Sequence, residues 1–191
     1  MLAFEIAKRL TGRGAEVRFV GSFHLPPHIK SRIRELDWST CSLYLALFLS
    51  LVSEDVSEGM AANPTFRSLP RTEMIQQVLD IADKSRLNEL GMETKGFMRW
   101  VDVVSGLQRI AAGYDPVGKV DSIDVFQAIP LRAVARSQEE WFQEHLSKWA
   151  DFVREPPRFH AVQGAHYTML RSEHVRSFAV TLIKALNVRG V

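Results

Sequence analysis

The sequence predicts an α/β fold with about three parallel strands, flanking helices and a large helical insert. Stretches rich in β-branched and aromatic residues alternate along the chain with segments of helical spacing. The helices between those stretches act as crossovers, and crossovers imply parallel pairing. Residues 28–112 hold no convincing strand, which makes that part of the chain a helical insert.

Composition excludes several classes of protein. The chain has 191 residues, enough for one domain with a buried core, and its 46% hydrophobic and 24% charged residues are ordinary for a globular protein. Global disorder is therefore excluded. Lys plus Arg is 24 against 22 for Asp plus Glu, so no basic excess exists to bind nucleic acid and no nucleic-acid partner is expected.

The single cysteine, Cys41, cannot form an internal disulfide and begins the apolar run 41–52. This run is well short of the roughly 20 residues that a membrane-spanning helix needs, so it predicts a buried helix and no membrane partner. No secretory leader is expected, because the N-terminal residues show neither a basic segment before an apolar block nor a small-residue cleavage site. A reducing, cytoplasmic location is expected.

The first elements are a helix, a turn and a strand. Apolar residues follow helical spacing over residues 2–10 with no capping residue ahead of them, which predicts missing sequence upstream. Glycines in residues 11–14 form a turn, and residues 17–23 alternate like a strand. Pro26 and Pro27 end that strand because proline has no N–H to donate.

The insert is predicted to be a series of short helices over residues 28–36, 39–52, 54–62, 71–82, 83–90 and 93–112. The helix at 39–52 is apolar on nearly every face, so it must be buried or must line an apolar pocket. Its expected opposite walls are Met74, Ile75, Val78 and Phe97. Plain core packing is the alternative interpretation of the same residues.

Strand character returns at residues 120–128 and again at 158–162. Residues 137–152 predict a helix capped by Ser137, and an apolar stripe predicts a last helix capped by Ser172. Three strands leave an open edge, so the sheet is expected to be incomplete. The isolated chain is therefore expected to associate with itself.

His166 follows the third predicted strand, in the loop at its carboxyl end. Ligands and catalysis favour that end of a parallel sheet, and a histidine there has the near-neutral pKa that a general base needs. A surface or hydrogen-bonded structural histidine is the alternative. His24 lies at another carboxyl end and is a possible neighbour of His166.

Other candidates for chemistry are weaker. His145, His160 and His174 have no acidic or cysteine partner at metal-ligand spacing, so they are expected to be structural and no metal site is expected. The nucleophile motif G-x-S-x-G is missing, and Cys41 lies in an apolar helix with no obvious base. No phosphate-binding or dinucleotide-binding loop occurs either, so no cofactor is expected.

Several segments in order resemble the thioesterase domain of fungal non-ribosomal-peptide-synthetase-like and polyketide synthases, most closely the atromentin-synthetase kind. These segments are Leu25–Lys30, Leu36–Trp38 with Leu43–Leu49, Tyr114–Gly118, Ile123–Leu131, Trp149–Phe152 and Gly164–Met169. The resemblance runs through nearly the whole chain. It implies that residues 1–191 form a single partial domain of α/β-hydrolase fold, namely its C-terminal two-thirds.

The resemblance also implies roles. His166 matches the histidine of the catalytic triad, residues 28–112 match the lid that covers the acyl chain, and the catalytic serine would lie a few residues before the chain begins. Within the lid, Leu45, Phe48 and Leu49 are the expected substrate contacts. The position of the triad acid is held by His24 or a neighbour, since residues 17–34 contain neither Asp nor Glu.

Two functions follow from the resemblance. The first is a thioesterase fragment without its nucleophile, whose complete form hydrolyses or cyclises an acyl group carried on the phosphopantetheine of a carrier domain. The second is a non-catalytic remnant that binds a carrier domain or has no activity, which the histidine at the acid position favours.

Overall fold

The computed structural model describes the backbone of residues 1–191 and the side chains of all of them except residues 31 and 32. The chain divides into two compact units. The sheet unit consists of residues 1–29 and 115–191, and the helical unit consists of residues 30–114.

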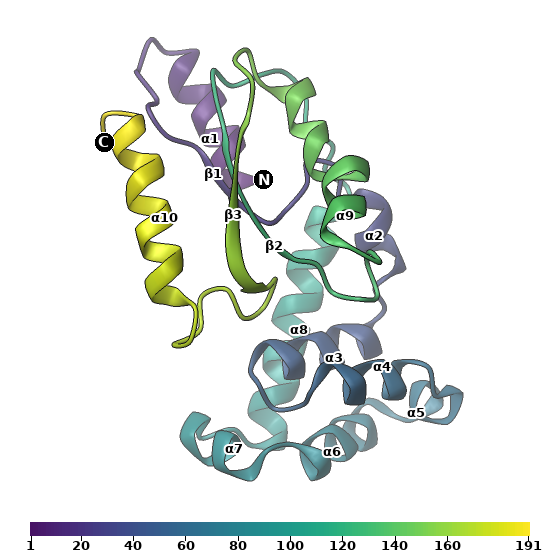
Figure 1. The fold of residues 1–191 in the computed structure, drawn as a ribbon. Coiled ribbons are helices and arrows are strands. Elements are labelled where there is room, and N and C mark those ends of the chain that lie inside the picture. Colours follow the sequence, from purple (N-terminus) through teal and green to yellow (C-terminus); the bar gives the residue numbers. More distant parts are fainter. The chain divides into compact units, whose positions relative to one another are not determined.

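The sheet unit is built on three parallel strands in the order β1-β2-β3 (Figure 1). They are β1 (Gly21–Phe23), β2 (Asp124–Ile129) and β3 (Arg158–Ala165). In the register, Phe23 pairs with Phe126, and Phe126 pairs with His160. The predicted α/β fold with parallel strands is confirmed.

The strands differ in length from the prediction. Of residues 17–23 only Gly21–Phe23 form a strand, because β2 is the partner of β1 and their pairing covers those three residues. The second strand starts at Asp124, and Val120 makes only an isolated parallel bridge. The third continues to Ala165, three residues beyond the prediction, because β2 runs beside it as far as Ile129.

Helices cover both faces of the sheet, as a parallel sheet requires. On the Val125 face the core includes residues of α1 (Leu2–Thr11), α9 (Gln138–Glu144) and the 3₁₀ helix η1 (Leu146–Phe152). On the Phe126 face it includes residues of α10 (Val175–Val188), which runs beside β3 in Figure 1. The alternation of neighbouring residues along β2 divides the two cores.

Two helix predictions in this unit need correction. The helix expected over 137–152 is broken at His145, whose backbone leaves the helical region, so it forms α9 and η1. Its predicted cap is confirmed, since Ser137 Oγ accepts the N–H of Glu140 at 3.1 Å. The predicted cap Ser172 is wrong, because that hydroxyl bonds Glu173 and α10 begins only after His174.

The helical unit contains α2 (Lys30–Glu35), α3 (Trp38–Phe48), α4 (Glu54–Ala61), α5 (Pro64–Ser68), α6 (Arg71–Ile81), α7 (Lys84–Leu90) and α8 (Thr94–Ala111). Helix α3 packs against α4, α6 and α8 around one hydrophobic core. Helix α8 has 18 residues. Among the described residues, neither it nor another helix is both long and apolar enough to cross a membrane.

Helix α3 begins and ends at identifiable signals. Asp37 caps its start, with the carboxylate accepting the N–H of Thr40 at 2.8 Å. The helix ends at Phe48 instead of residue 52 because Ser50 takes a left-handed conformation with φ 62°. The N–H of Leu51 then bonds the carbonyl of Ala46 at 2.9 Å, which satisfies a carbonyl of the last turn.

The sequence prediction missed α5. It lies between the helices expected over 54–62 and 71–82, and Asn63 and Pro64 start it. The Asn63 side chain accepts the N–H of Thr65 at 2.9 Å, and Pro64 takes the first helical position, where its missing N–H costs nothing.

Candidate functional site

His166 lies directly after β3, at the carboxyl end of the sheet. Its backbone N–H donates to the carbonyl of Ile129 at 3.0 Å, which continues the pairing of β2 with β3. The turn that follows is fixed by Thr168, whose hydroxyl accepts the N–H of Ala165 at 2.8 Å. Gly164, with φ 84°, permits the preceding bend.

His24 occupies the equivalent place after β1. Its N–H donates to the carbonyl of Phe126 at 2.8 Å, and its φ of 60° turns the chain away from the sheet. Because β1 and β3 flank β2 on either side, residues that follow both strands meet above the end of β2. The rings of His24 and His166 lie with centroids 5.4 Å apart and planes tilted by 40°.

The His24 side chain is part of the interior, with 2% of its surface exposed. Its Nδ1 accepts the backbone N–H of Ala128 at 3.0 Å. Trp141 of α9 stacks on the ring, with centroids 5.4 Å apart. The other ring nitrogen, Nε2, is buried and has no hydrogen-bond partner among the residues whose side chains are described.

His166 also has a buried ring nitrogen without a hydrogen-bond partner among the described residues. This nitrogen is Nδ1, the atom that a triad acid would hold. Burial lowers the pKa of His166. Burial, together with the charge that His166 would carry, lowers the pKa of His24 to about 3. Near neutral pH the two rings are therefore both uncharged.

A histidine–carboxylate pair does occur elsewhere, and the sequence analysis missed it. His160 Nε2 lies 2.6 Å from Oδ1 of Asp124, and the Nε of Arg189 donates to the other carboxylate oxygen at 2.8 Å. Asp124 begins β2, whereas His166 adjoins the last residue of β2, so this group lies at the opposite end of the strand. The sequence analysis considered only partners at metal-ligand spacing along the chain, whereas this partner lies 36 residues away and is adjacent across the sheet.

The three residues expected to contact substrate lie in or just after the last turn of α3. Leu45 is 7% exposed and belongs to the core of the helical unit, together with the predicted opposite walls Met74, Ile75, Val78 and Phe97. Those walls therefore contact α3 as packed core. Phe48 is 55% exposed, and Leu49 is partly buried.

Cys41 is buried in the same core, and its thiol donates to Oε1 of Gln108. Burial raises the pKa of the Cys41 thiol. A thiol held in the protonated form is a poor nucleophile. The structural role expected from the sequence therefore agrees with this environment.

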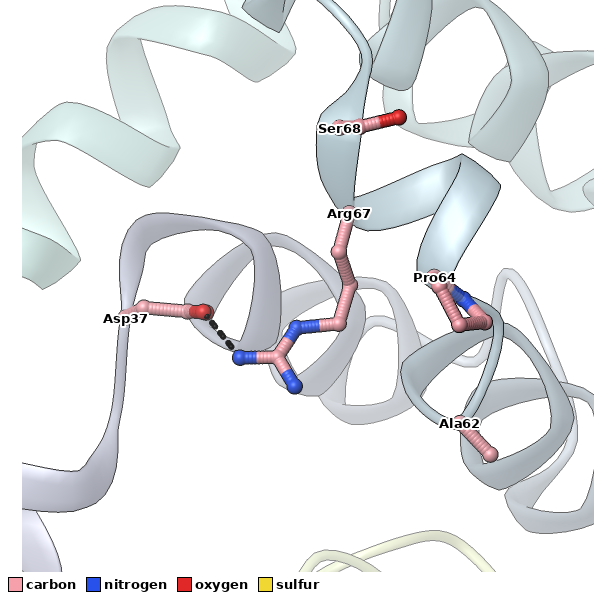
Figure 2. A pocket seen from close by; sticks show the side chains of 5 residues that line it. All are labelled: Asp37, Ala62, Pro64, Arg67 and Ser68. Carbon is pink, nitrogen blue, oxygen red and sulfur yellow. Dashed lines mark hydrogen bonds and ion pairs between the residues drawn. The ribbon is translucent and has the colours of Figure 1, made fainter.

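An open pocket of about 430 Å³ lies in the helical unit (Figure 2). Asp37, Ala62, Pro64, Arg67 and Ser68 line it. Arg67 donates to the Asp37 carboxylate at 2.8 Å. Burial opposes ionisation of Asp37, but hydrogen bonds from Ser39, Thr40 and Arg67 outweigh it and hold the pKa of this carboxyl well below its usual range. The two charged groups of the pocket, Asp37 and Arg67, are thus paired with each other.

The sequence was compared with known proteins. No family model matches it. Aspulvinone E synthetase of Aspergillus terreus is 49% identical over 191 residues, which are 100% of this chain and 20% of the relative. Atromentin synthetase of Serpula lacrymans is 40% identical over 191 residues, 19% of its length. The chain spans about one fifth of the length of the curated relatives it matches.

Solved structures give the fold. The Vlm2 thioesterase domain aligns with a TM-score of 0.59 at 23% identity, over 95% of this chain and 60% of that domain. A four-domain nonribosomal peptide synthetase aligns with a TM-score of 0.62 at 17% identity, over 95% of this chain. Over its whole length the chain is therefore homologous to a segment that makes up about one fifth of these fungal synthetases, and its fold is the α/β-hydrolase fold of thioesterase domains.

Proposed function

We propose that this chain supplies the catalytic imidazole and the acyl-binding helices of a thioesterase domain that releases an acyl group from a phosphopantetheine carrier. In this proposal the serine nucleophile and its oxyanion hole come from sequence upstream of residue 1, and the domain works in the cytoplasm as part of a synthetase with a carrier domain. The observation that carries the proposal is the position of His166 at the carboxyl end of β3.

The environment of His166 suits proton transfer. A general base must be uncharged at the working pH, and the burial that lowers the pKa of His166 keeps it so. The ordered turn after β3 supports its backbone on both sides. Rigid placement of the imidazole is what an acyl-transfer site requires.

The helical unit is the proposed lid, and Phe48 is its best candidate for contact with an acyl chain. It projects an exposed aromatic ring from the last turn of α3. Leu49 adjoins it, and Leu45, which is buried in the core beneath, supports that turn.

A chimaera tests the proposal. The sequence that precedes the matched segment in aspulvinone E synthetase would be joined to residues 1–191 of this chain, and hydrolysis of an acyl-pantetheine thioester would be measured. We expect turnover by the chimaera and none above background by the 191-residue chain alone, because the proposal places the nucleophile and the oxyanion hole in the added upstream sequence.

The decisive variant is His166→Ala in the chimaera, which should lower kcat by about 10⁴-fold or more. His28→Ala is the matched control, because His28 is an exposed histidine outside the pair. Hydrolysis by the chimaera that is insensitive to His166→Ala, or hydrolysis by the isolated chain that depends on His166, would contradict the proposal.

The second candidate function is a carrier-binding remnant without catalysis, and it rests on the histidine at the acid position. Binding of a phosphopantetheinylated carrier domain from a relative, measured by calorimetry, separates the two. Binding by a chimaera that shows no turnover favours the remnant, whereas binding with turnover that depends on His166 favours the thioesterase.

A further inference from the structure

We propose that His24 holds His166 in the tautomer that carries its proton on Nε2, through a hydrogen bond from His24 Nε2–H to His166 Nδ1, made directly or through one water. His24 is then a positioning residue. It donates a hydrogen bond to Nδ1 of His166, whereas the carboxylate of a triad accepts one from that atom. The tautomer of His24 follows from its bond to Ala128, the tautomer of His166 follows from the proposed bond, and the effect on catalysis rests on the proposed function.

The backbone fixes the tautomer of His24. The N–H of Ala128 can only donate, so His24 Nδ1 at 3.0 Å must accept and cannot carry a proton. In the neutral ring the proton then lies on Nε2. Because His24 is buried and its pKa is about 3, the neutral form is the one present at ordinary pH.

The donor that results needs an acceptor. His24 Nε2 is buried and has no partner within the described residues, and leaving such a group unpaired costs roughly 1–3 kcal/mol. The nearby ring of His166 carries a buried, equally unpaired Nδ1. The two nitrogens are not hydrogen-bonded to each other in the structure, but a centroid separation of 5.4 Å is short enough for one such bond once a ring rotates to direct its nitrogen at the other.

This hydrogen bond runs in the opposite direction to the bond between the acid and the histidine of a catalytic triad. A carboxylate accepts the proton of histidine Nδ1 and leaves Nε2 free to receive the proton of serine. A donor at the same place requires an unprotonated Nδ1 and so puts the proton of His166 on Nε2. The resting imidazole then faces its substrate as a proton donor and must change tautomer before it can act as a base.

Nitrogen-detected NMR of the ¹⁵N-labelled 191-residue chain tests the tautomers without any assay of activity. Two-bond proton–nitrogen spectra at neutral pH distinguish protonated from unprotonated ring nitrogens. We expect Nε2–H for His24 and for His166. The Nδ1–H tautomer for either ring in the wild-type chain would overturn the proposal.

Two variants test the cause. His24→Glu places a carboxylate near the position of Nε2 and should shift His166 to Nδ1–H, and His24→Leu, which can neither donate nor accept, should leave His166 without its preference for Nε2–H. The exposed residue His28, changed to Glu, should have no effect. A His166 tautomer that is the same in wild type, His24→Glu and His24→Leu would show that His24 does not set it, and the wild-type spectrum decides the matter if a variant does not fold.

In the chimaera, His24→Glu should raise kcat by about tenfold or more, within the roughly 10⁴-fold that a wrong tautomer costs a triad. Lower or unchanged kcat, with the tautomer shifted, would overturn the catalytic consequence and leave the tautomer standing. A chimaera inactive in both forms would contradict the proposed function only, because the spectra of the isolated chain do not depend on turnover.

Discussion

Arg189, just past the last turn of α10, donates from Nε to the carboxylate of Asp124 at 2.8 Å, and so fastens the end of that helix to the first residue of β2. Both side chains are buried, with 8% and 1% of their surfaces exposed. His160 takes the second carboxylate oxygen. One carboxylate thus links two strands and a helix.

Asp124→Asn should lower the free energy of unfolding by up to about 3–5 kcal/mol, because it removes the buried carboxylate from the guanidinium of Arg189 and leaves only a longer contact, 3.7 Å, with the exposed carboxylate of Glu155. Urea unfolding followed by circular dichroism measures the effect. Asp121→Asn is the control, since its ion pair with Arg154 is exposed and should contribute less than about 1 kcal/mol. Equal effects of the two changes would show that the buried pair adds nothing beyond a surface pair.

His24 should make the chain sensitive to acid. Its pKa is near 6.5 when unfolded and about 3 when folded, so between these values the unfolded state binds one more proton. Stability should therefore fall as pH drops below 6.5, by about 1.4 kcal/mol per pH unit from this group. His24→Gln does not titrate there and should flatten the slope of unfolding free energy against pH. A slope that is unchanged in this variant would contradict the assignment.

Gly164→Ala should disturb the turn that presents His166. An added Cβ would lie 2.5 Å from Cδ2 of His174, and φ at this position is +84°. Positive φ alone costs a non-glycine residue roughly 1–2 kcal/mol. Gly14→Ala is the control that measures the cost of positive φ alone, because φ at Gly14 is +80° and nothing lies within 4 Å of the added Cβ. We expect a larger loss of melting temperature for Gly164→Ala, and equal losses would rule out the clash.

In the helical unit, Asp37→Ala should cost about 1–2 kcal/mol because it removes the cap of α3. Arg67→Ala removes only the partly exposed ion pair to the same carboxylate and should cost less than about 1 kcal/mol. Denaturant unfolding of both variants measures the difference. A larger loss from Arg67→Ala would mean that the ion pair, and not the cap, stabilises this end of α3.

The isolated chain should associate with itself. Strand β1 pairs with β2 on one side, and its opposite edge has no strand beside it in the three-stranded sheet. Leu2 and Ile6 of α1 are also 75% and 47% exposed, and burial of apolar surface yields roughly 25 cal/mol per Å². Size-exclusion chromatography with light scattering should show oligomers, and a monodisperse, cooperatively melting monomer of 21.7 kDa would contradict this prediction.

Periodicity along the chain predicted the helices better than the strands. The hydrogen bonds of a helix join residues that are close along the chain, so its signals are local in the sequence. The cap Ser137, which bonds the N–H of Glu140 three residues later, is one such signal. The length of β1 depends on how much of β2 lies beside it, which no local pattern shows. The end of α3 was missed because Ser50 takes a conformation that glycine usually adopts.

In the candidate site, too, one contact could be predicted from the sequence and another could not. His24 and His166 could be expected to meet, because both follow strands whose carboxyl ends share one edge of the sheet. Asp124 and His160 are 36 residues apart and become neighbours only through the register of β2 and β3. Their pairing could not be predicted before that register was known.

The two units have hydrophobic cores with no residue in common: the core of the helical unit is drawn from residues 36–104, and the cores of the sheet unit from residues outside that range. The helical unit is one continuous segment of the chain, inserted into the sheet unit between β1 and β2. A substitution in one core therefore changes none of the residues that form the other. The helical unit can therefore accumulate changes on its surface, or be exchanged as one continuous segment, without any need to rebuild the sheet that carries the two histidines.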